Sequence, residues 1–286
     1  MDPGKKIKVL IIDDSLLFRE ILSKIISSNE NMEVAGFAMD PFDAKDRIIE
    51  TRPDVITCNV EMPTMDGIEF VRQLLTQYFV PVVMVSSVSE KVFEAMNVGA
   101  VDFVVKPNIK SDQSIESFKI DLINKIKAAS MVKNGAQRIL KPAESMSGTI
   151  DCCAGKIIAI GASTGGTEAI YNIIKALPPT VPGIVITQHI PTVFSKMFAE
   201  RLDTQTPLKV KEAETGDYAE QGTVLVAPGD KHIKVKRVGS KYKVECFEGE
   251  KVSGHRPSVD VLFDSVAKAA GRNAIGILLT GMGYDG

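Results

Sequence analysis

Three residues in the C-terminal half of the chain have side chains that could together carry out serine-based hydrolysis. Ser163 lies in the glycine-rich stretch Gly161–Gly166, where an apolar strand pattern gives way to a helical pattern. His189 directly follows the next predicted strand, and Asp285 follows the last one. A serine hydroxyl needs a neighbouring base to act as a nucleophile at neutral pH, and a carboxylate can hold that base in the right tautomer. These residue types predict a nucleophile, a base and an orienting group.

A parallel sheet would bring these three side chains together. In the second half of the chain, the pattern predicts strands over 156–161, 183–188, 208–213, 223–227 and 274–280, helices over 167–176, 191–202 and 259–270, and a hairpin over 232–246. The carboxyl ends of parallel strands lie at one edge of a sheet, so Ser163, His189 and Asp285 are expected to converge there. The other two histidines, His232 and His255, lie in loop-like contexts without such a placement.

The glycine-rich turn around Ser163 has a second interpretation. A turn of this kind between a strand and a helix often binds phosphate, which would make this half a nucleotide-binding module. The dinucleotide pattern G-x-G-x-x-G would, however, need glycine at position 163, and no acidic residue closes the second strand. In the hydrolase interpretation, the turn places Ser163 at a helix N-terminus, where free N–H groups and the helix dipole can stabilise an oxyanion.

Four further residues are candidates for oxyanion or substrate binding. Thr164 and Gly165 follow the candidate nucleophile, and Met282 lies in the glycine-rich segment before the candidate acid. Arg256 has two interpretations that the sequence leaves open, namely contact with an acidic substrate or an ion pair with Asp260. No cofactor is expected to take part in catalysis.

The first half of the chain places a different set of polar residues at predicted strand ends. Asp13 and Asp14 follow the first strand, whereas later strands end at Asn59, Ser86 and Lys106. Adjacent carboxylates can hold Mg²⁺ through hard oxygen ligands, and a hydroxyl and a lysine opposite them could grip a phosphoryl group. Strands are expected over 7–12, 32–38, 55–60, 81–86 and 103–105, alternating with helices over 16–26, 43–51, 67–77, 90–97 and 114–131. This alternation predicts an α/β fold with a doubly wound parallel sheet.

This set of polar residues resembles the receiver domains of response regulators over about Lys8–Met131, including the pair Lys106-Pro107 and the loop over 61–67. The resemblance implies a Mg²⁺ site at the acidic pair and places the family's phospho-accepting aspartate at Asn59. Because an amide is not a carboxylate nucleophile and carries no charge, we expect no phosphorylation at this position and weakened Mg²⁺ binding. An engineered substitution, or a domain kept only as a fold and docking surface, is the alternative interpretation.

The second half contains several motifs in register with the candidate catalytic residues. They are Gly161-x-Ser163-x-Gly165-Gly166, Gln188-His189-x-Pro191, Ala227-Pro228-Gly229-Asp230-x-His232, Arg256-Pro257-x-Val259-Asp260 and Thr280-Gly281-Met282-Gly283-x-Asp285-Gly286. Together they resemble the Rossmann-like catalytic domain of the chemotaxis protein-glutamate methylesterases, the CheB family, from about Lys156 to the end. The order Ser…His…Asp differs from the Ser…Asp…His order of the α/β-hydrolases, which disfavours that fold.

The CheB resemblance implies triad roles for Ser163, His189 and Asp285. It also implies hydrolysis of γ-glutamyl methyl esters on methyl-accepting chemotaxis receptors, with release of methanol, and in some members deamidation of receptor glutamines. The implied partners are these receptors and a chemotaxis histidine kinase, and the implied regulation is a receiver that covers the active site until it is phosphorylated. A non-catalytic signalling or docking protein is the alternative, supported by Asn59 and by the early end of the chain.

The segment between the two halves shows no sustained hydrophobic periodicity. We therefore expect a receiver-like domain over 1–131, a linker over 132–155 and a methylesterase catalytic domain over 156–286. The chain ends directly after a predicted strand, where a parallel domain would continue with a covering helix. We therefore expect the catalytic domain to be truncated at its C-terminus.

The composition excludes several classes of function. A net charge of −2 and the absence of Trp argue against a surface for nucleic acid, and the longest apolar runs are too short for membrane insertion. No signal peptide is visible, so a cytoplasmic protein is expected. We also expect a monomer. The cysteines Cys58, Cys152, Cys153 and Cys246 lack C-x-x-C spacing, which predicts reduced thiols and no zinc site.

Overall fold

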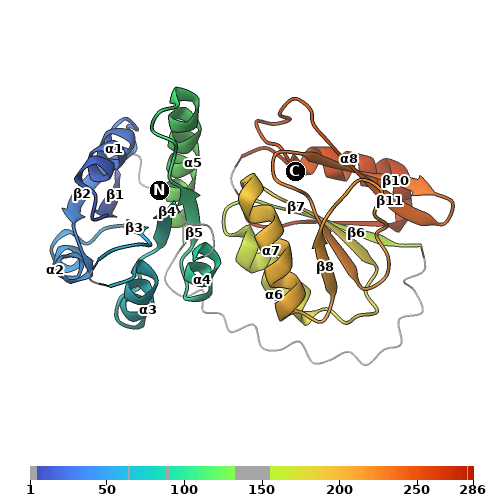
Figure 1. Cartoon of the computed structure of the whole chain (residues 1–286), viewed down its shortest axis with the longest axis horizontal. Helices are drawn as coiled ribbons and strands as arrows, with labels where there is room; N and C mark the ends of the chain where they lie inside the picture. Colours follow the sequence, from blue (N-terminus) through green and yellow to red (C-terminus); the bar gives the residue numbers. More distant parts are fainter. Residues whose placement is uncertain (1–4, 64, 88–90, 133–154, 282) are drawn as a thin grey trace. The chain divides into compact units, whose positions relative to one another are not determined.

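The chain divides into two compact units, Met1–Lys141 and Pro142–Gly286 (Figure 1). The structure, a computed structural model, describes residues 5–63, 65–87, 91–132, 155–281 and 283–286. Most of the predicted linker over 132–155, with Cys152 and Cys153, lies outside the described residues, as does Met282. Among the helices that are described, none is long and apolar enough to cross a bilayer.

The first unit is built on a five-stranded parallel sheet with the order β2-β1-β3-β4-β5. Its strands are β1 (Ile7–Ile12), β2 (Met32–Ala38), β3 (Val55–Asn59), β4 (Val82–Ser86) and β5 (Asp102–Val105). Its helices are α1 (Leu16–Ser27), α2 (Pro41–Thr51), α3 (Gly67–Gln77), α4 (Val92–Asn97) and α5 (Asp112–Ser130). The predicted doubly wound sheet is therefore confirmed.

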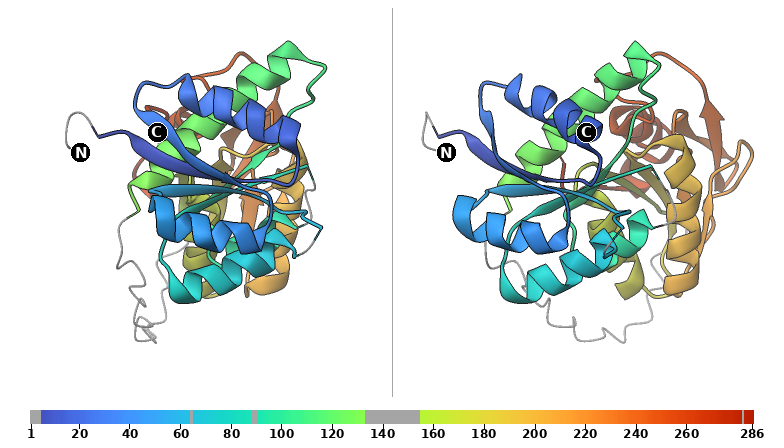
Figure 2. Two further views of the ribbon diagram at one scale, coloured as in Figure 1. Left: turned by 90° about the vertical axis from the view of Figure 1, so that its left-hand side faces the viewer. Right: turned by 60° about the vertical axis from the view of Figure 1, so that its left-hand side comes forward.

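Helices cover both faces of this first sheet (Figure 2). On one face α1 and α5 pack together, and the rings of Phe18 and Phe118 meet edge to face with their centroids 5.9 Å apart. The same hydrophobic cluster includes Val9 and Ile11 of β1. Because both faces are covered, β3 and β4 are buried along their whole length. This explains why these strands appear in the sequence as continuous apolar runs.

Two helices of the first unit begin ahead of their periodic hydrophobic residues because polar side chains cap them. The Asp40 carboxylate accepts hydrogen bonds from N–H groups of the first turn of α2, which starts at Pro41. Ser111 caps α5 in the same way, so this helix starts at Asp112 rather than at the predicted Ser114. The hydrophobic pattern alone does not register such turns.

The second unit has its own five-stranded parallel sheet, with the order β12-β6-β7-β9-β8. Its strands are β6 (Ile157–Ala162), β7 (Gly183–Gln188), β8 (Lys209–Glu212), β9 (Thr223–Val226) and β12 (Ala274–Leu278). A separate antiparallel hairpin joins β10 (His232–Val238) to β11 (Lys241–Phe247). The helices are α6 (Gly166–Ala176), α7 (Thr192–Gln205) and α8 (Val259–Ala270), followed by the 3₁₀ turn Gly271–Asn273.

Two different layers cover this second sheet. Helices α6 and α7 lie side by side, whereas α8 lies with the β10–β11 hairpin (Figure 1). The hydrophobic cluster of that second layer joins Leu262 of α8 and Val235 of β10 to Ile157 and Ala159 of β6. Since side chains alternate along a strand, the intervening residues Ile158 and Ile160 point to the opposite face.

The sheet order puts β6 at the centre of the functional edge. β6 pairs with β7 on one side and with β12 on the other. The strand order therefore reverses at β6. In open parallel sheets, ligands bind beyond the carboxyl ends of the strands at such a reversal. Near the end of β6, a Cβ added to Gly161 would lie 2.2 Å from Cγ1 of Val259. The absence of a side chain at Gly161 therefore lets the N-terminus of α8 approach β6.

Candidate active site

Ser163 is held in a tight turn between β6 and α6. Its backbone N–H donates to the carbonyl of Thr280, 2.9 Å away, and its own carbonyl accepts from the N–H of Gly166 at 2.8 Å. Gly165 caps the helix with a φ of 73°, a conformation that glycine adopts without strain. The backbone of the candidate nucleophile is thus fixed both by the segment after β12 and by the start of α6.

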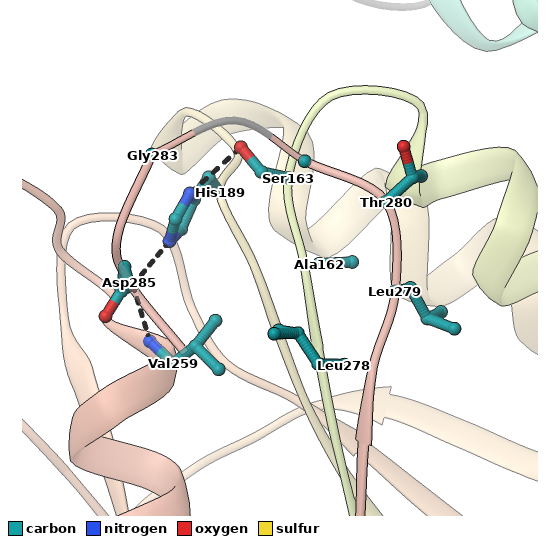
Figure 3. A pocket seen from close by; sticks show the side chains of 10 residues that line it. Ala162, Ser163, His189, Val259, Leu278, Leu279, Thr280, Gly283 and Asp285 are labelled. Carbon is teal, nitrogen blue, oxygen red and sulfur yellow. Dashed lines mark hydrogen bonds and ion pairs between the residues drawn. The ribbon is translucent and has the colours of Figure 1, made fainter.

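The structure brings Ser163, His189 and Asp285 together in one hydrogen-bonded series (Figure 3). Nδ1 of His189 lies 3.0 Å from Oγ of Ser163, and Nε2 lies 2.7 Å from Oδ2 of Asp285. Because a carboxylate can only accept, Nε2 carries the proton and Nδ1 is left with a lone pair facing the serine hydroxyl. The imidazole is therefore in the tautomer that can take a proton from Ser163.

Gln188 connects the backbones of the candidate nucleophile and the candidate base. Its buried side-chain amide donates to the carbonyl of Ser163 at 2.8 Å and to that of His189 at 3.2 Å. The N–H of His189 in turn donates to the carbonyl of Ala162. These bonds fix the spacing between the ends of β6 and β7. The sequence pointed to Gln188 only as part of a motif and assigned it no role.

The Asp285 carboxylate lies at the N-terminus of α8. Oδ1 accepts from Oγ of Ser258 at 2.6 Å and from the N–H of Asp260 at 3.0 Å, while Oδ2 accepts from the N–H of Val259 at 2.7 Å. Burial alone would raise the pKa of Asp285, but the bond from His189 and these helix-terminal bonds outweigh it and hold this pKa well below its usual range. The group therefore stays ionised and acts as an acceptor.

The loop-like context expected for His232 is wrong, whereas His255 does lie in a turn but its ring reaches the candidate base. His232 begins β10 and is buried; its Nε2 donates to the carbonyl of Glu250, and its Nδ1 accepts from the N–H of Ser258. His255 stacks on the candidate base His189, with ring centroids 3.7 Å apart and planes within 6°. The alternating pattern over 232–246 already placed His232 at the start of a hairpin strand, whereas the stack of His255 on His189 joins distant parts of the chain that hydrophobic periodicity does not link.

Arg256 forms an ion pair, but not with the residue considered from the sequence. Its guanidinium contacts Oδ1 of Asp230 at 2.7 Å and also donates to the carbonyl of Gly249. The Asp260 side chain instead accepts from Oγ of Ser253 and from the N–H of Gly286. The predicted pair with Asp260 is therefore wrong, and Arg256 braces the segment that carries His255.

A cavity of about 100 Å³ adjoins the three candidate catalytic residues (Figure 3). Its wall combines Ser163, His189 and Asp285 with a set of mainly apolar and small residues, Ala162, Val259, Leu278, Leu279, Thr280, Gly281 and Gly283. Thr164, beside the nucleophile, is buried, and no described residue accepts from its backbone N–H. Candidate residue Met282 lies outside the described part of the chain.

The receiver-like unit gathers its polar residues at the corresponding edge of its own sheet. Nζ of Lys106 lies 2.8 Å from Oδ2 of the buried Asp13, and the N–H of Ser15 donates to Oδ1 of Asp13. The side-chain amide of Asn59 donates to Oδ1 of Asp14 at 2.8 Å and to the carbonyl of Glu61 at 2.6 Å. Ser86, which ends β4, is also buried. The predicted set is therefore assembled around the ends of β1, β3, β4 and β5.

In this arrangement the Asn59 amide competes with a Mg²⁺ ion for the oxygen atoms that would bind it. Both neighbours of the Asn59 amide nitrogen are acceptors, so its NH₂ group faces them and lies where a cation shared by Asp14 and the Glu61 carbonyl would lie. The Asp13 carboxylate is already neutralised by Lys106. In the part of the chain that is described, no group of three or more His, Cys, Asp or Glu side chains could hold a metal ion.

These features define a class of protein, an α/β serine hydrolase joined to a receiver domain. Residues 158–286 match the CheB methylesterase family, and residues 9–117 match the response regulator receiver domain family. Together with the relatives described next, these matches show that the chain belongs to the CheB methylesterase family. The family resemblance and the α/β fold class predicted from the sequence are confirmed.

Relatives with curated names span nearly the whole chain. The "protein-glutamate methylesterase/protein-glutamine glutaminase 2" of Syntrophomonas wolfei is 50% identical over 99% of this chain and 82% of its own length. The corresponding protein of Salmonella choleraesuis is 45% identical over 98% of this chain and 82% of its own length. Among solved structures, the methylesterase catalytic domain of Thermotoga maritima CheB is 42% identical, covering 46% of this chain and 70% of that chain with a TM-score of 0.45.

Proposed function

We propose that this chain hydrolyses γ-glutamyl methyl esters on methyl-accepting chemotaxis receptors, and that it also deamidates receptor glutamines. The observation that carries the proposal is the bonded series from the Ser163 hydroxyl through the His189 ring to the Asp285 carboxylate. Relatives of this chain carry names for the same two activities. The proposed enzyme works in the cytoplasm, where the receptor methylation sites and the chemotaxis histidine kinase are its partners.

The first half-reaction transfers the glutamyl group to the enzyme. Oγ of Ser163 attacks the γ-carbonyl carbon while its proton passes to Nδ1 of His189, and the carbonyl oxygen becomes an oxyanion. We assign the backbone N–H of Thr164 as a donor to that oxyanion, as for the residue after the nucleophile in other serine hydrolases. The tetrahedral intermediate then breaks its bond to the methoxy oxygen, which takes the proton from Nδ1 and leaves as methanol.

The second half-reaction releases the receptor glutamate. Water attacks the ester carbon of the glutamyl-enzyme and gives its proton to Nδ1 of His189. The bond to Oγ of Ser163 then breaks, and Oγ recovers that proton. Asp285 keeps its negative charge throughout and stabilises the imidazolium formed at each step. With a glutamine substrate the same steps release ammonia in place of methanol.

We propose that the receiver-like unit regulates the catalytic domain by a route other than phosphorylation at position 59. We infer that Asn59 does not accept a phosphoryl group and that its amide weakens Mg²⁺ binding at Asp13 and Asp14. Ser86 and Lys106 remain the proposed switch residues around this position. Residues 132–155 are the proposed linker to the catalytic domain, and Arg256 remains a candidate substrate contact only through the face that its pair with Asp230 leaves open.

Methanol release from methylated receptor membranes tests the proposed activity directly. Wild-type protein is expected to release methanol, whereas Ser163→Ala is expected to lower the rate by about 10⁴-fold or more, because it removes the nucleophile. Thermal melting of both proteins checks that the substitution leaves the fold intact. Equal background release from both folded proteins would exclude the enzyme and favour a non-catalytic docking protein.

A further inference from the structure

We propose that His255 is a positioning residue for this hydrolysis, which holds the plane of the His189 ring and stabilises the imidazolium that forms there. The inference rests on the proposed function, since it concerns the same site. Its basis is the parallel stack of the two imidazoles, with centroids 3.7 Å apart and an angle of 6° between the planes. No motif in the sequence gave His255 a role.

The contacts of His189 within its ring plane leave one motion weakly opposed. Ser163 and Asp285 bond the ring through Nδ1 and Nε2, so both bonds act nearly along one line through the ring. Rotation about that line is opposed mainly by the side-chain torsions, and the outer torsion of histidine is broad. A flat ring packed against one face opposes this tilt, and so keeps the lone pair of Nδ1 directed at the serine hydroxyl.

The segment that carries His255 is itself rigidly held. Val252 and His255 exchange two backbone hydrogen bonds of 3.1 and 2.9 Å across a tight turn. Both central residues of that turn, Ser253 and Gly254, have positive φ values of 51° and 82°, as a two-residue hairpin turn requires. On the other side of His255, Arg256 is fixed by its bonds described above. Such bracing is expected where the orientation of one ring matters.

The stack can accommodate the positive charge that develops on His189 only while His255 is neutral. Burial and the neighbouring His189 lower the pKa of His255, as does Lys251, whereas Asp285 acts in the opposite direction. In the part of the chain that the structure describes, these are the groups that shift this pKa. A neutral imidazole then presents its π face to the cation, a favourable arrangement for an aromatic ring over a positive charge.

Substitutions at position 255 separate ring stacking from simple space filling. His255→Phe and His255→Tyr keep a flat face, whereas His255→Leu fills similar space without one. The readout is the second-order rate at which a fluorophosphonate probe labels Ser163 in the full chain, with Ser163→Ala as the unlabelled control and thermal melting as the check on folding. The probe needs no receptor, so receptor docking does not enter the measurement.

We expect His255→Leu to label about three- to tenfold more slowly than the wild type, and at least one of the flat-ring variants to stay within about twofold of it. With methylated receptors, the same loss should appear in kcat and leave KM unchanged. A folded Leu variant that labels at the wild-type rate, or flat-ring variants that are all as slow as Leu, would overturn the inference alone. A folded wild type that the probe does not label would instead overturn the proposed function.

Discussion

The two units place acidic residues at the carboxyl edges of two parallel sheets, yet the carboxylates have different hydrogen-bond partners there. At the candidate catalytic edge, Asp285 accepts from N–H and O–H donors of helix α8 and its N-cap, and also from the proposed base His189. At the receiver edge, Asp14 is bonded by the amide of Asn59, and Asp13 by Lys106. The fold supplies the edge in both cases, and the partners of each carboxylate decide what the edge can do.

The partners also determine whether a reactive group is left open. In the catalytic unit, the series of bonds ends at the Ser163 hydroxyl, which lines a cavity. In the receiver-like unit, the amide of Asn59 lies between the oxygens that would otherwise bind a cation. One edge therefore presents the proposed nucleophile beside its proposed base, whereas the other has a hydrogen-bond donor at the position where a carboxylate nucleophile was expected.

Removing the charge of the catalytic carboxylate should have the largest effect on this contrast. Asp285→Asn is expected to lower the rate of labelling of Ser163 by a fluorophosphonate by about 10⁴-fold, because an amide can donate to His189 and favour the wrong tautomer. Asp264→Asn, an exposed position on the same helix α8, is the matched control and should label at the wild-type rate. A loss of less than about tenfold in Asp285→Asn would deny the carboxylate its proposed role.

Removing the hydroxyl that supports this carboxylate should have a smaller effect. Ser258→Ala deletes a 2.6 Å bond to Asp285 and the N-cap of α8, so we expect an activity loss of about 10- to 30-fold and a stability loss of about 1 kcal/mol. Ser111→Ala removes the equivalent cap from α5 in the other unit. It should lower stability similarly without changing activity, and equal activity in the two variants would contradict the special position of Ser258.

Restoring a carboxylate at the receiver edge should make the two edges more alike. Asn59→Asp removes the amide from between Asp14 and the Glu61 carbonyl and adds a negative ligand, so Mg²⁺ affinity is expected to rise by about tenfold or more. Acetyl phosphate with Mg²⁺ should then add one phosphoryl group to the variant and none at this position of the wild type. Intact mass with peptide mapping locates any phosphoryl group. A phosphoryl group at position 59 of the wild type would contradict the inference that Asn59 does not accept one.

The smallest expected effect is on the pH dependence of stability. Because the pKa of Asp285 is lower in the folded protein than its ordinary value near 3.9, its carboxylate stabilises the fold above about pH 4. This contribution is lost as the pH falls toward the lower folded pKa. The gap in melting temperature between wild type and Asp285→Asn should therefore narrow from about pH 4 downwards, whereas that between wild type and Ser163→Ala should not change. A gap for Asp285→Asn that stays constant to pH 2 would contradict the assignment.

Much of the site could be predicted from the sequence because its residues lie at the ends of strongly patterned strands. The apolar runs ending near Ser163, His189 and Asp285 fix which edge each side chain reaches, since a parallel sheet leaves little freedom in topology. The same reasoning located Asp13 and Asn59 at the edge of the first sheet. Which side chains hydrogen-bond to one another could not be predicted, because that depends on side-chain positions within a few tenths of an ångström.

The residues that support the catalytic series were missed for a related reason. His255 reaches His189 through a short turn whose position depends on the Arg256 pair with Asp230, a contact between segments that no local pattern links. The capping role of Ser258 was easier to predict, because a serine directly before the periodic helix α8 is a typical N-cap. What the sequence could not indicate is that the same hydroxyl also bonds the Asp285 carboxylate.

The close approach of Gly161 to Val259 limits which residues related chains can have at these two positions. A methyl group at 161 would overlap the Val259 side chain, and the backbone N–H of Val259 donates to the Asp285 carboxylate. A displacement of Val259 at this contact would therefore also move the Asp285 carboxylate, the proposed acid of the triad. In an alignment of related chains, a bulkier residue at 161 should appear only together with a smaller one at 259, so these two positions should co-vary although neither takes part in the chemistry.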